Sequence, residues 1–126
     1  GDSRAYLLRD GKLLRLTEDH TKVQDQIRNG MLTLEESVKS PLRHVLTRAV
    51  GVLDQIDVDV QEVILSSADK ILICSDGLTD MVSEQEIKKI LSTELKLEKS
   101  VAELIKCAND AGGIDNITLA LMGYPS

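Results

Sequence analysis

The chain has 126 residues, and its 15 lysines and arginines against 21 aspartates and glutamates give a formal charge of −6. This length suits one domain, and 42% hydrophobic with 29% charged residues is ordinary globular composition. Trp and Phe are absent and Tyr occurs only twice, so stacking platforms for bases are excluded, and the acidic charge disfavours a nucleic acid partner. No apolar run approaches the roughly 20 residues of a membrane span, so no membrane segment is expected.

Two strands are predicted at the start of the chain, at residues 4–9 and 12–16. Both runs are rich in aliphatic residues, and only Asp10 and Gly11 separate them. Asp-Gly is typical of two-residue hairpin turns, because both central positions of such a turn need positive φ. The pattern therefore predicts a β-hairpin.

A helical insertion on the surface is predicted over residues 21–50. Gly30 is placed to end a first helix, and Thr33 with Glu36 has the spacing of a capping box for a second helix, which Pro41 limits. The apolar residues at helical spacing are Val23, Ile27 and Met31.

Four further segments have strand character. Residues 45–50 form a candidate strand, and residues 57–63 alternate apolar and polar side chains with a period of two. Residues 70–75 are a continuous apolar run, which is typical of a central strand that is covered on both faces. Residues 117–122 form the last predicted strand.

Two helices are predicted between the last two strands. The first starts near Ser83, with Glu86 completing a capping box, and the second starts near Ser100, with Glu103 as its partner. A glycine-containing break at residues 111–116 ends the second helix.

The two cysteines indicate a reducing compartment. Cys74 and Cys107 both lie among aliphatic residues, and one pair adds little to a domain that already has a core. We therefore expect buried, free thiols and a cytoplasmic protein. The chain begins at Gly1 without an initiator Met or a signal peptide, which suggests a piece of a longer protein.

Three aspartates stand apart because each lies at a strand end beside glycine or a tight loop. Asp2 precedes the first strand, Asp76 follows the central one and Asp115 precedes the last. If these ends converge, a cation must neutralise the like charges, and an all-oxygen set favours Mg²⁺ or Mn²⁺ over zinc. Asp-Gly and Gly-x-Asp are also common turn sequences, so spacing alone leaves a solvated role open.

Other polar side chains are weaker candidates. His20 and His44 have no second His or Cys at ligand spacing, which favours a surface or loop-bonded role over metal binding. Arg43 and Arg48 lie in the insertion and could meet an anionic substrate, although such arginines are more often plain surface charges. No Gly-x-Ser-x-Gly elbow surrounds Ser75, so a nucleophilic serine is not expected.

Five segments in order carry a family resemblance: GDSRAYL at 1–7, LTEDH at 16–20, VLTRAVG at 45–51, ICSDGLTD at 73–80 and GGIDNIT at 112–118. Together they resemble the C-terminal half of bacterial metal-dependent protein serine/threonine phosphatases of the 2C type, the PPM family. The resemblance covers essentially all 126 residues. It implies an α+β fold, namely a β-sandwich of antiparallel sheets flanked by helices. This chain would be the C-terminal part of one catalytic domain, with residues 21–50 as a flap beside the active site.

The resemblance also implies a metal-dependent reaction. In that family a water bridging two Mg²⁺ or Mn²⁺ ions attacks the phosphorus of phosphoserine or phosphothreonine, without a covalent enzyme intermediate. Asp76 and Asp115 would ligate this core metal pair, and Asp2 would help to hold a third, weaker ion. Gly77 and Asn116 would shape the turn and orient Asp115. The expected partners are phosphoprotein substrates and an opposing serine/threonine kinase.

The resemblance covers only half of the family's domain. The N-terminal half supplies the aspartate that bridges the core metals, an arginine for the phosphate and a histidine proposed as general acid, and none of these has a counterpart in this chain. We therefore expect the chain alone to bind metal poorly and to lack appreciable phosphatase activity. Its unpaired strand edges would favour self-association.

Two other functions stay open at this point. A non-catalytic module of the same fold could bind a phosphoprotein or a regulatory partner, and a sandwich domain could lack metal altogether. The three aspartates favour descent from an active enzyme, because a binding module has no physical need for a carboxylate cluster.

Overall fold

The computed structural model describes residues 1–125, and the chain divides into two compact units. The first, which we call the helical unit, comprises residues 1–2 and 18–63. The second, which we call the sheet unit, comprises residues 3–17 and the chain from residue 64 onward. No helix among the described residues is long and apolar enough to cross a membrane.

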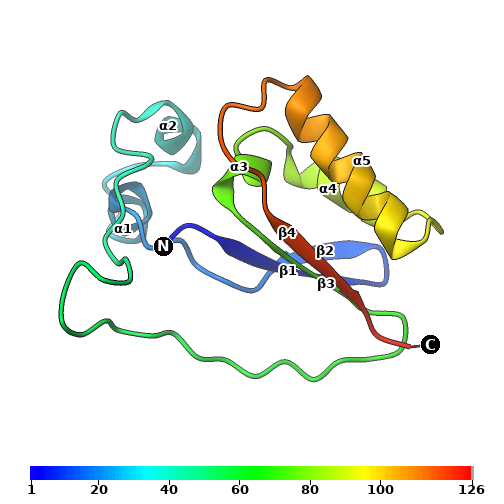
Figure 1. Cartoon of the computed structure of the whole chain (residues 1–126). Coiled ribbons are helices and arrows are strands. Elements are labelled where there is room, and N and C mark those ends of the chain that lie inside the picture. Colours follow the sequence, from blue (N-terminus) through cyan, green and yellow to red (C-terminus); the bar gives the residue numbers. More distant parts are fainter. Residues whose placement is uncertain (126) are drawn as a thin grey trace. The chain divides into compact units, whose positions relative to one another are not determined.

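The sheet unit contains a four-stranded sheet in which every neighbouring pair is antiparallel, in the order β2-β1-β3-β4 (Figure 1). The strands are β1 (Arg4–Arg9), β2 (Lys12–Arg15), β3 (Lys70–Cys74) and β4 (Leu119–Gly123). The predicted hairpin is confirmed, since Asp10 and Gly11 have φ of 51° and 70° between β1 and β2. The last strand lies slightly later than the predicted residues 117–122.

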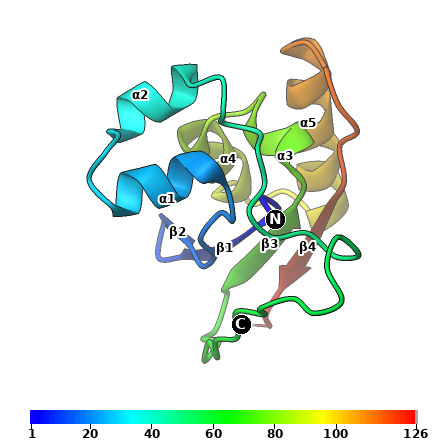
Figure 2. The same cartoon turned by 90° about the vertical axis from the view of Figure 1, so that its left-hand side faces the viewer.

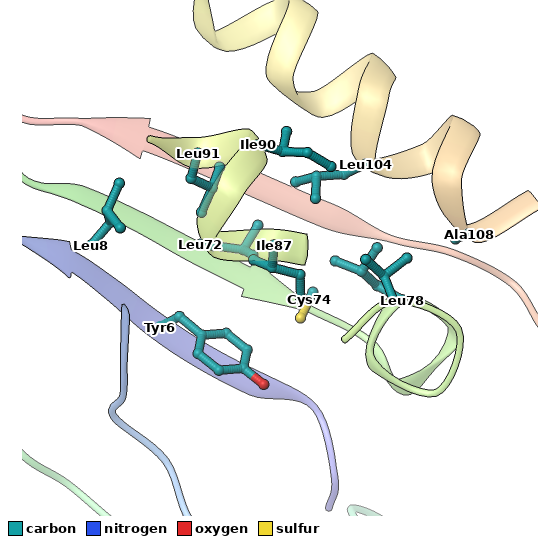
Figure 3. Packing of buried hydrophobic residues seen from close by; sticks show 11 residues of the cluster. Tyr6, Leu8, Leu72, Cys74, Leu78, Ile87, Ile90, Leu91, Leu104 and Ala108 are labelled. Atoms are coloured by element: carbon teal, nitrogen blue, oxygen red, sulfur yellow. The ribbon is translucent and has the colours of Figure 1, made fainter. Parts of the chain in front are cut away.

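Three helices cover one face of this sheet and form the core with it (Figure 3). They are α3 (Asp76–Thr79), α4 (Glu84–Leu91) and α5 (Leu97–Asp110). The register places Tyr6 opposite Leu72 and Leu72 opposite Leu121, so these side chains share the helix-facing side. Fully buried members of the core are Tyr6, Leu72, Leu78, Ile87 and Leu104. Each buried leucine or isoleucine of this kind contributes about 1.5–3 kcal/mol.

The opposite face of the sheet is apolar and partly open in the described residues. Leu14 and Met122 are each 48% exposed, and Ile73 is 54% exposed. The prediction that residues 70–75 are covered on both faces is therefore wrong for this chain. Alternate side chains of a strand point to opposite faces, so Leu72 turns toward the helices while Ile73 turns away.

The two long helices begin differently. Ser83 is the N-cap of α4, as expected, and its hydroxyl accepts the backbone N–H of Glu86, which is one of the two hydrogen bonds of the predicted capping box. The prediction that the next helix starts near Ser100 is wrong, because α5 begins at Leu97. The Leu97 side chain lies within contact distance of a Cβ position at Gly123 on β4, so packing starts the helix one turn earlier. Ser100 is fully buried inside α5.

Among the described residues the two cysteines are not joined in a disulfide, and the prediction that both are buried holds for Cys74 but not for Cys107, which is partly exposed. Cys74 is buried in the core and Cys107 packs against it. Burial raises the pKa of the Cys107 thiol, and the carboxylate of Glu103 adds to the effect.

The helical unit contains α1 (Lys22–Arg28) and α2 (Leu34–Lys39), which contact each other (Figure 2). Gly30 follows α1 with φ of 73°, and the N–H of Met31 donates to the carbonyl of Gln26, as in a Schellman motif. Thr33 and Glu36 form the predicted capping box with both reciprocal hydrogen bonds. The two expected helices of residues 21–50 are present.

The two predicted strands of this region do not form in the described structure. Within residues 45–50 there is a single isolated bridge, between Leu46 and Thr21. Residues 57–63 have no strand assignment, and Val58 and Val60 are 73% and 86% exposed. An alternating sequence becomes a strand only with a hydrogen-bonding partner, and the described strand pairings do not include this segment.

Candidate metal centre

Asp76 is held at the end of the central strand of the sheet unit. β3 ends at Cys74, Ser75 is the N-cap of α3, and Asp76 is the first residue of that helix. The Ser75 N–H donates to the carbonyl of Thr118 at 2.9 Å, which continues the β3–β4 pairing by one step. The backbone that carries Asp76 is therefore fixed on a strand end, a rigid support for a ligand.

Asp115 lies in the loop between α5 and β4. Gly112 and Gly113 have φ of 135° and 53°, and the Gly113 N–H donates to the carbonyl of Ala108, so the chain leaves the helix through positive-φ residues. One carboxylate oxygen of Asp115 accepts the backbone N–H of Asn116 at 2.7 Å. Asp115 is exposed, so its carboxylate can reach a ligand.

Gly77 brings these two segments into direct contact. A Cβ at position 77 would collide with the carbonyl oxygen of Asn116. Glycine is therefore required for this close approach rather than for its backbone angles. The residue after Asp76 thus touches the residue after Asp115.

The donor chemistry of these two segments fits a hard divalent cation. Asp76 and Asp115 offer carboxylate oxygens, and the backbone carbonyl oxygen of Asn116 lies against Gly77. The neighbouring thiol of Cys74 is buried in the core, so it is not available as a soft ligand. An all-oxygen set of this kind suits Mg²⁺ or Mn²⁺ rather than zinc.

Asp2 belongs to the helical unit, where it has a neighbour that the sequence reasoning missed. A carboxylate oxygen of Asp2 and a ring nitrogen of His44 lie within 4.8 Å of each other. The backbone explains this approach: the His20 N–H donates to the carbonyl of Gly1, and the Thr47 N–H donates to the carbonyl of His20. Three segments distant in sequence therefore run side by side, and no local pattern around His44 could have revealed them.

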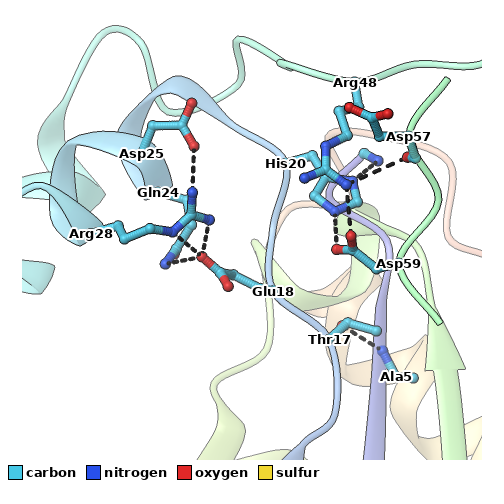
Figure 4. A network of polar contacts seen from close by, with 11 residues as sticks. Ala5, Thr17, Glu18, His20, Gln24, Asp25, Arg28, Arg48, Asp57 and Asp59 are labelled. Carbon is cyan, nitrogen blue, oxygen red and sulfur yellow. Dashed lines mark hydrogen bonds and ion pairs between the residues drawn. The ribbon is translucent and has the colours of Figure 1, made fainter. Parts of the chain in front are cut away.

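His20 has the loop-bonded role that its sequence context favoured (Figure 4). Its Nε2 lies 2.8 Å from Oδ2 of Asp59, and Arg48 donates to Oδ1 of the same carboxylate at 2.8 Å. The hydrogen bond from Arg48, with a second contribution from His20, lowers the pKa of Asp59 to about 2. This network holds residues 57–59, which have no regular secondary structure.

The two arginines predicted for substrate binding both have local partners. Arg48 donates to Asp59 and to the carbonyl of Asp57. Arg43 is exposed and donates to the carbonyl of Ser40 at 3.0 Å. Their contact with a substrate stays a prediction, and Arg43 is the less constrained of the two because its partner is a neutral carbonyl.

Comparison with known proteins gives this geometry a family context. The profile of the family "Protein phosphatase 2C" matches residues 1–117. The protein phosphatase PhpP of Streptococcus pneumoniae serotype 2 is 42% identical over 122 residues, which are 97% of this chain and 50% of PhpP. The chain spans about half the length of the curated relatives it matches.

Solved structures agree in fold. A serine/threonine phosphatase of S. agalactiae matches all of this chain and 52% of its own, with a TM-score of 0.94 and 35% identity. The catalytic domain of the serine threonine protein phosphatase PstP, solved with two manganese ions, matches 96% of this chain and 49% of its own, with a TM-score of 0.79 and 37% identity. The α+β phosphatase fold expected from the sequence is thus confirmed, with this chain as a part of it. The chain belongs to the Protein phosphatase 2C family.

Proposed function

We propose that the protein carrying this chain hydrolyses phosphoserine and phosphothreonine in protein substrates with the help of Mg²⁺ or Mn²⁺. Family membership supports this reaction class. The observation that carries the proposal is the contact of Gly77 with Asn116, because it joins the segments of two oxygen ligands. Two bound ions would supply an activated water and neutralise charge on the phosphoryl group.

The residues of this chain then have distinct tasks. Asp76 and Asp115 hold the core metal pair, while Gly77 sets the spacing of their segments and Asn116 orients Asp115. Asp2 contributes to a third, weaker ion. PstP, solved with two manganese ions, supports a two-metal core in this family.

The surroundings of the site belong to the same proposal. Residues 1–126 form the C-terminal part of one catalytic domain, and residues 21–50 act as its flap, where Arg43 and Arg48 meet the phosphoprotein. A serine/threonine kinase supplies the substrates by the opposing reaction. Two cysteines that are not joined in a disulfide support a cytoplasmic location.

The isolated chain is proposed to be inactive and prone to self-association. It spans about half the length of its relatives, and its sheet leaves Leu14, Ile73 and Met122 partly exposed on one face. Mn²⁺-dependent hydrolysis of p-nitrophenyl phosphate by the isolated chain would contradict the first point. Light scattering that shows a monomer at high concentration would contradict the second.

The main test uses the full-length protein that carries this chain. We expect Asp76→Asn and Asp115→Asn each to lower Mn²⁺-dependent dephosphorylation of a phosphothreonine peptide by about 100-fold or more, since loss of residues that merely support a metal ligand costs 10–100-fold. Asp110→Asn is the matched control, because Asp110 is an exposed carboxylate paired with Lys106. Wild-type activity in Asp76→Asn and Asp115→Asn would refute the proposal.

A further inference from the structure

Ser75 uses its hydroxyl in an unusual way for a residue that precedes a helix. It occupies the N-cap position of α3, where serine ordinarily caps its own helix, yet it makes no such bond. The hydroxyl instead accepts the N–H of Thr118 at 3.1 Å and donates to the carbonyl of Asn116 at 3.3 Å. Ser83, the N-cap of α4, shows the ordinary behaviour.

These two hydrogen bonds join segments that carry the two proposed ligands. Ser75 and Gly77 lie on either side of Asp76, and both contact Asn116, which directly follows Asp115. The Gly77 contact limits how close the two segments approach. The Ser75 hydroxyl limits how far they separate, because it bonds to Asn116 and to Thr118 at once.

We propose that Ser75 is a positioning residue, whose hydroxyl fixes the Asp115 segment against the Asp76 segment and thereby raises the affinity of the site for a divalent cation. The inference rests on the proposed function, in which these two aspartates are metal ligands. A hydroxyl suits the task because it donates and accepts in one group, as Thr can and Ala cannot. Ser75 touches neither substrate nor reacting atoms in this role.

The test measures Mn²⁺ binding directly in the full-length protein, without substrate, by the EPR signal of free Mn²⁺. We expect Ser75→Ala to raise the Kd for Mn²⁺ by about 10-fold, as is typical for residues that orient metal ligands. Ser75→Thr keeps both hydrogen bonds and should bind nearly as the wild type does. Ser83→Ala removes a hydroxyl that bonds to the N–H of Glu86 and not to Asn116 or Thr118, and it should leave the Kd unchanged.

Two further readouts separate positioning from a merely structural role. At saturating Mn²⁺, Ser75→Ala should regain nearly the wild-type kcat, with the KM for p-nitrophenyl phosphate unchanged. The amide of Thr118 should exchange faster with solvent in metal-free Ser75→Ala, because it loses an acceptor. Should Ser75→Ala fail to fold, Ser75→Cys keeps the size with a much weaker donor, and it should show the same weaker Mn²⁺ binding.

The outcomes are distinct. An unchanged Kd for Mn²⁺ in folded Ser75→Ala or Ser75→Cys overturns the inference, and so does a Ser75→Thr variant as defective as Ser75→Ala. A wild-type protein that binds no Mn²⁺, or an Asp76→Asn variant that binds it normally, overturns the proposed function and the positioning role together. Weaker Mn²⁺ binding by Ser75→Ala, together with normal Mn²⁺ binding by the wild type, supports both the proposed function and the positioning role.

Discussion

Different interactions stabilise each of the two units of the chain. The sheet unit has a continuous core in which residues from two strands and three helices are fully buried. Among the described residues of the helical unit, only Thr21 and Val23 are classed as buried. Its contacts are instead helix caps and charge pairs, such as Glu18 with Arg28 and Arg48 with Asp59.

This difference predicts different responses to conditions. Salt does not screen apolar burial, whereas exposed charge pairs weaken as salt screens them or as acid protonates their carboxylates. The proposed ligands Asp76 and Asp115 are carried by the unit with the core, and the proposed flap lies in the unit with the charge pairs. Rigidity is thus concentrated where ligand spacing matters most.

The largest effect should come from the core of the sheet unit. Leu72 is fully buried, so Leu72→Ala should lower the free energy of unfolding by about 2–5 kcal/mol through lost burial and the cavity left behind. Ile73 is the matched control on the same strand, and Ile73→Ala on the open face should cost less than about 1 kcal/mol in this chain. Urea unfolding measures both, and equal losses would contradict a core on one face only.

Replacing a glycine by alanine should lower the free energy of unfolding in both units, but for a different reason in each. Gly77→Ala should lower the free energy of unfolding by about 1–3 kcal/mol, because the new Cβ collides with the Asn116 carbonyl. Gly30→Ala meets no atom within 4 Å and should cost about 1 kcal/mol from its φ of 73° alone. NMR should then show shifted amides at Asn116 for the first variant and only local shifts for the second.

Two serines of the sheet unit should change stability in opposite directions. Ser83→Ala removes the cap of α4 and should cost about 1 kcal/mol. Ser100→Ala should instead gain up to about 1 kcal/mol, because the buried Ser100 hydroxyl has no hydrogen-bond partner among the described residues. Thermal unfolding of the two variants tests this, and a destabilised Ser100→Ala would reveal an ordered water at that hydroxyl.

The smallest expected effect is the loss of stability of the helical unit in acid. The folded pKa of Asp59, about 2, lies below that of an unfolded aspartate, so its stabilising contribution is complete above about pH 4 and is lost as pH falls toward 2. A carboxyl ¹³C titration should place the Asp59 midpoint near 2, and Arg48→Gln should raise it. Asp54→Asn, at an exposed position, is the control and should leave the midpoint unchanged. A wild-type midpoint near 4 would mean that the network does not persist in solution.

The predictions that depend on neighbouring residues alone were the most reliable. The Asp10-Gly11 turn and the Thr33 capping box depend on neighbouring residues alone, and both formed as predicted. The Ser-x-x-Glu pattern at Ser100 misled because packing of Leu97 began the helix earlier. Residues 57–63 have the alternation of a strand, but alternation cannot supply the partner that a strand needs.

At the candidate site, too, contacts between segments distant in sequence could not be predicted. The glycine after Asp76 was visible in the sequence, and the close approach of Gly77 to Asn116 gives it a physical reason. The bonds of the Ser75 hydroxyl to a segment about 40 residues away could not be read from any local pattern. The same holds for His44 beside Asp2.

The pairing of β1 with β3 has a consequence for the order of events during synthesis. Leu8 pairs with Lys70 and Arg4 with Cys74, so roughly 60 residues of chain must be made after the hairpin before its partner strand exists. A hairpin closes in about 1–10 μs, whereas a ribosome needs roughly 3–12 s for that length. Two strands alone are marginally stable in water. Within this chain, Tyr6 and Leu8 of the nascent hairpin therefore have no partners from β3 or from the helices of the core until seconds after the hairpin is made.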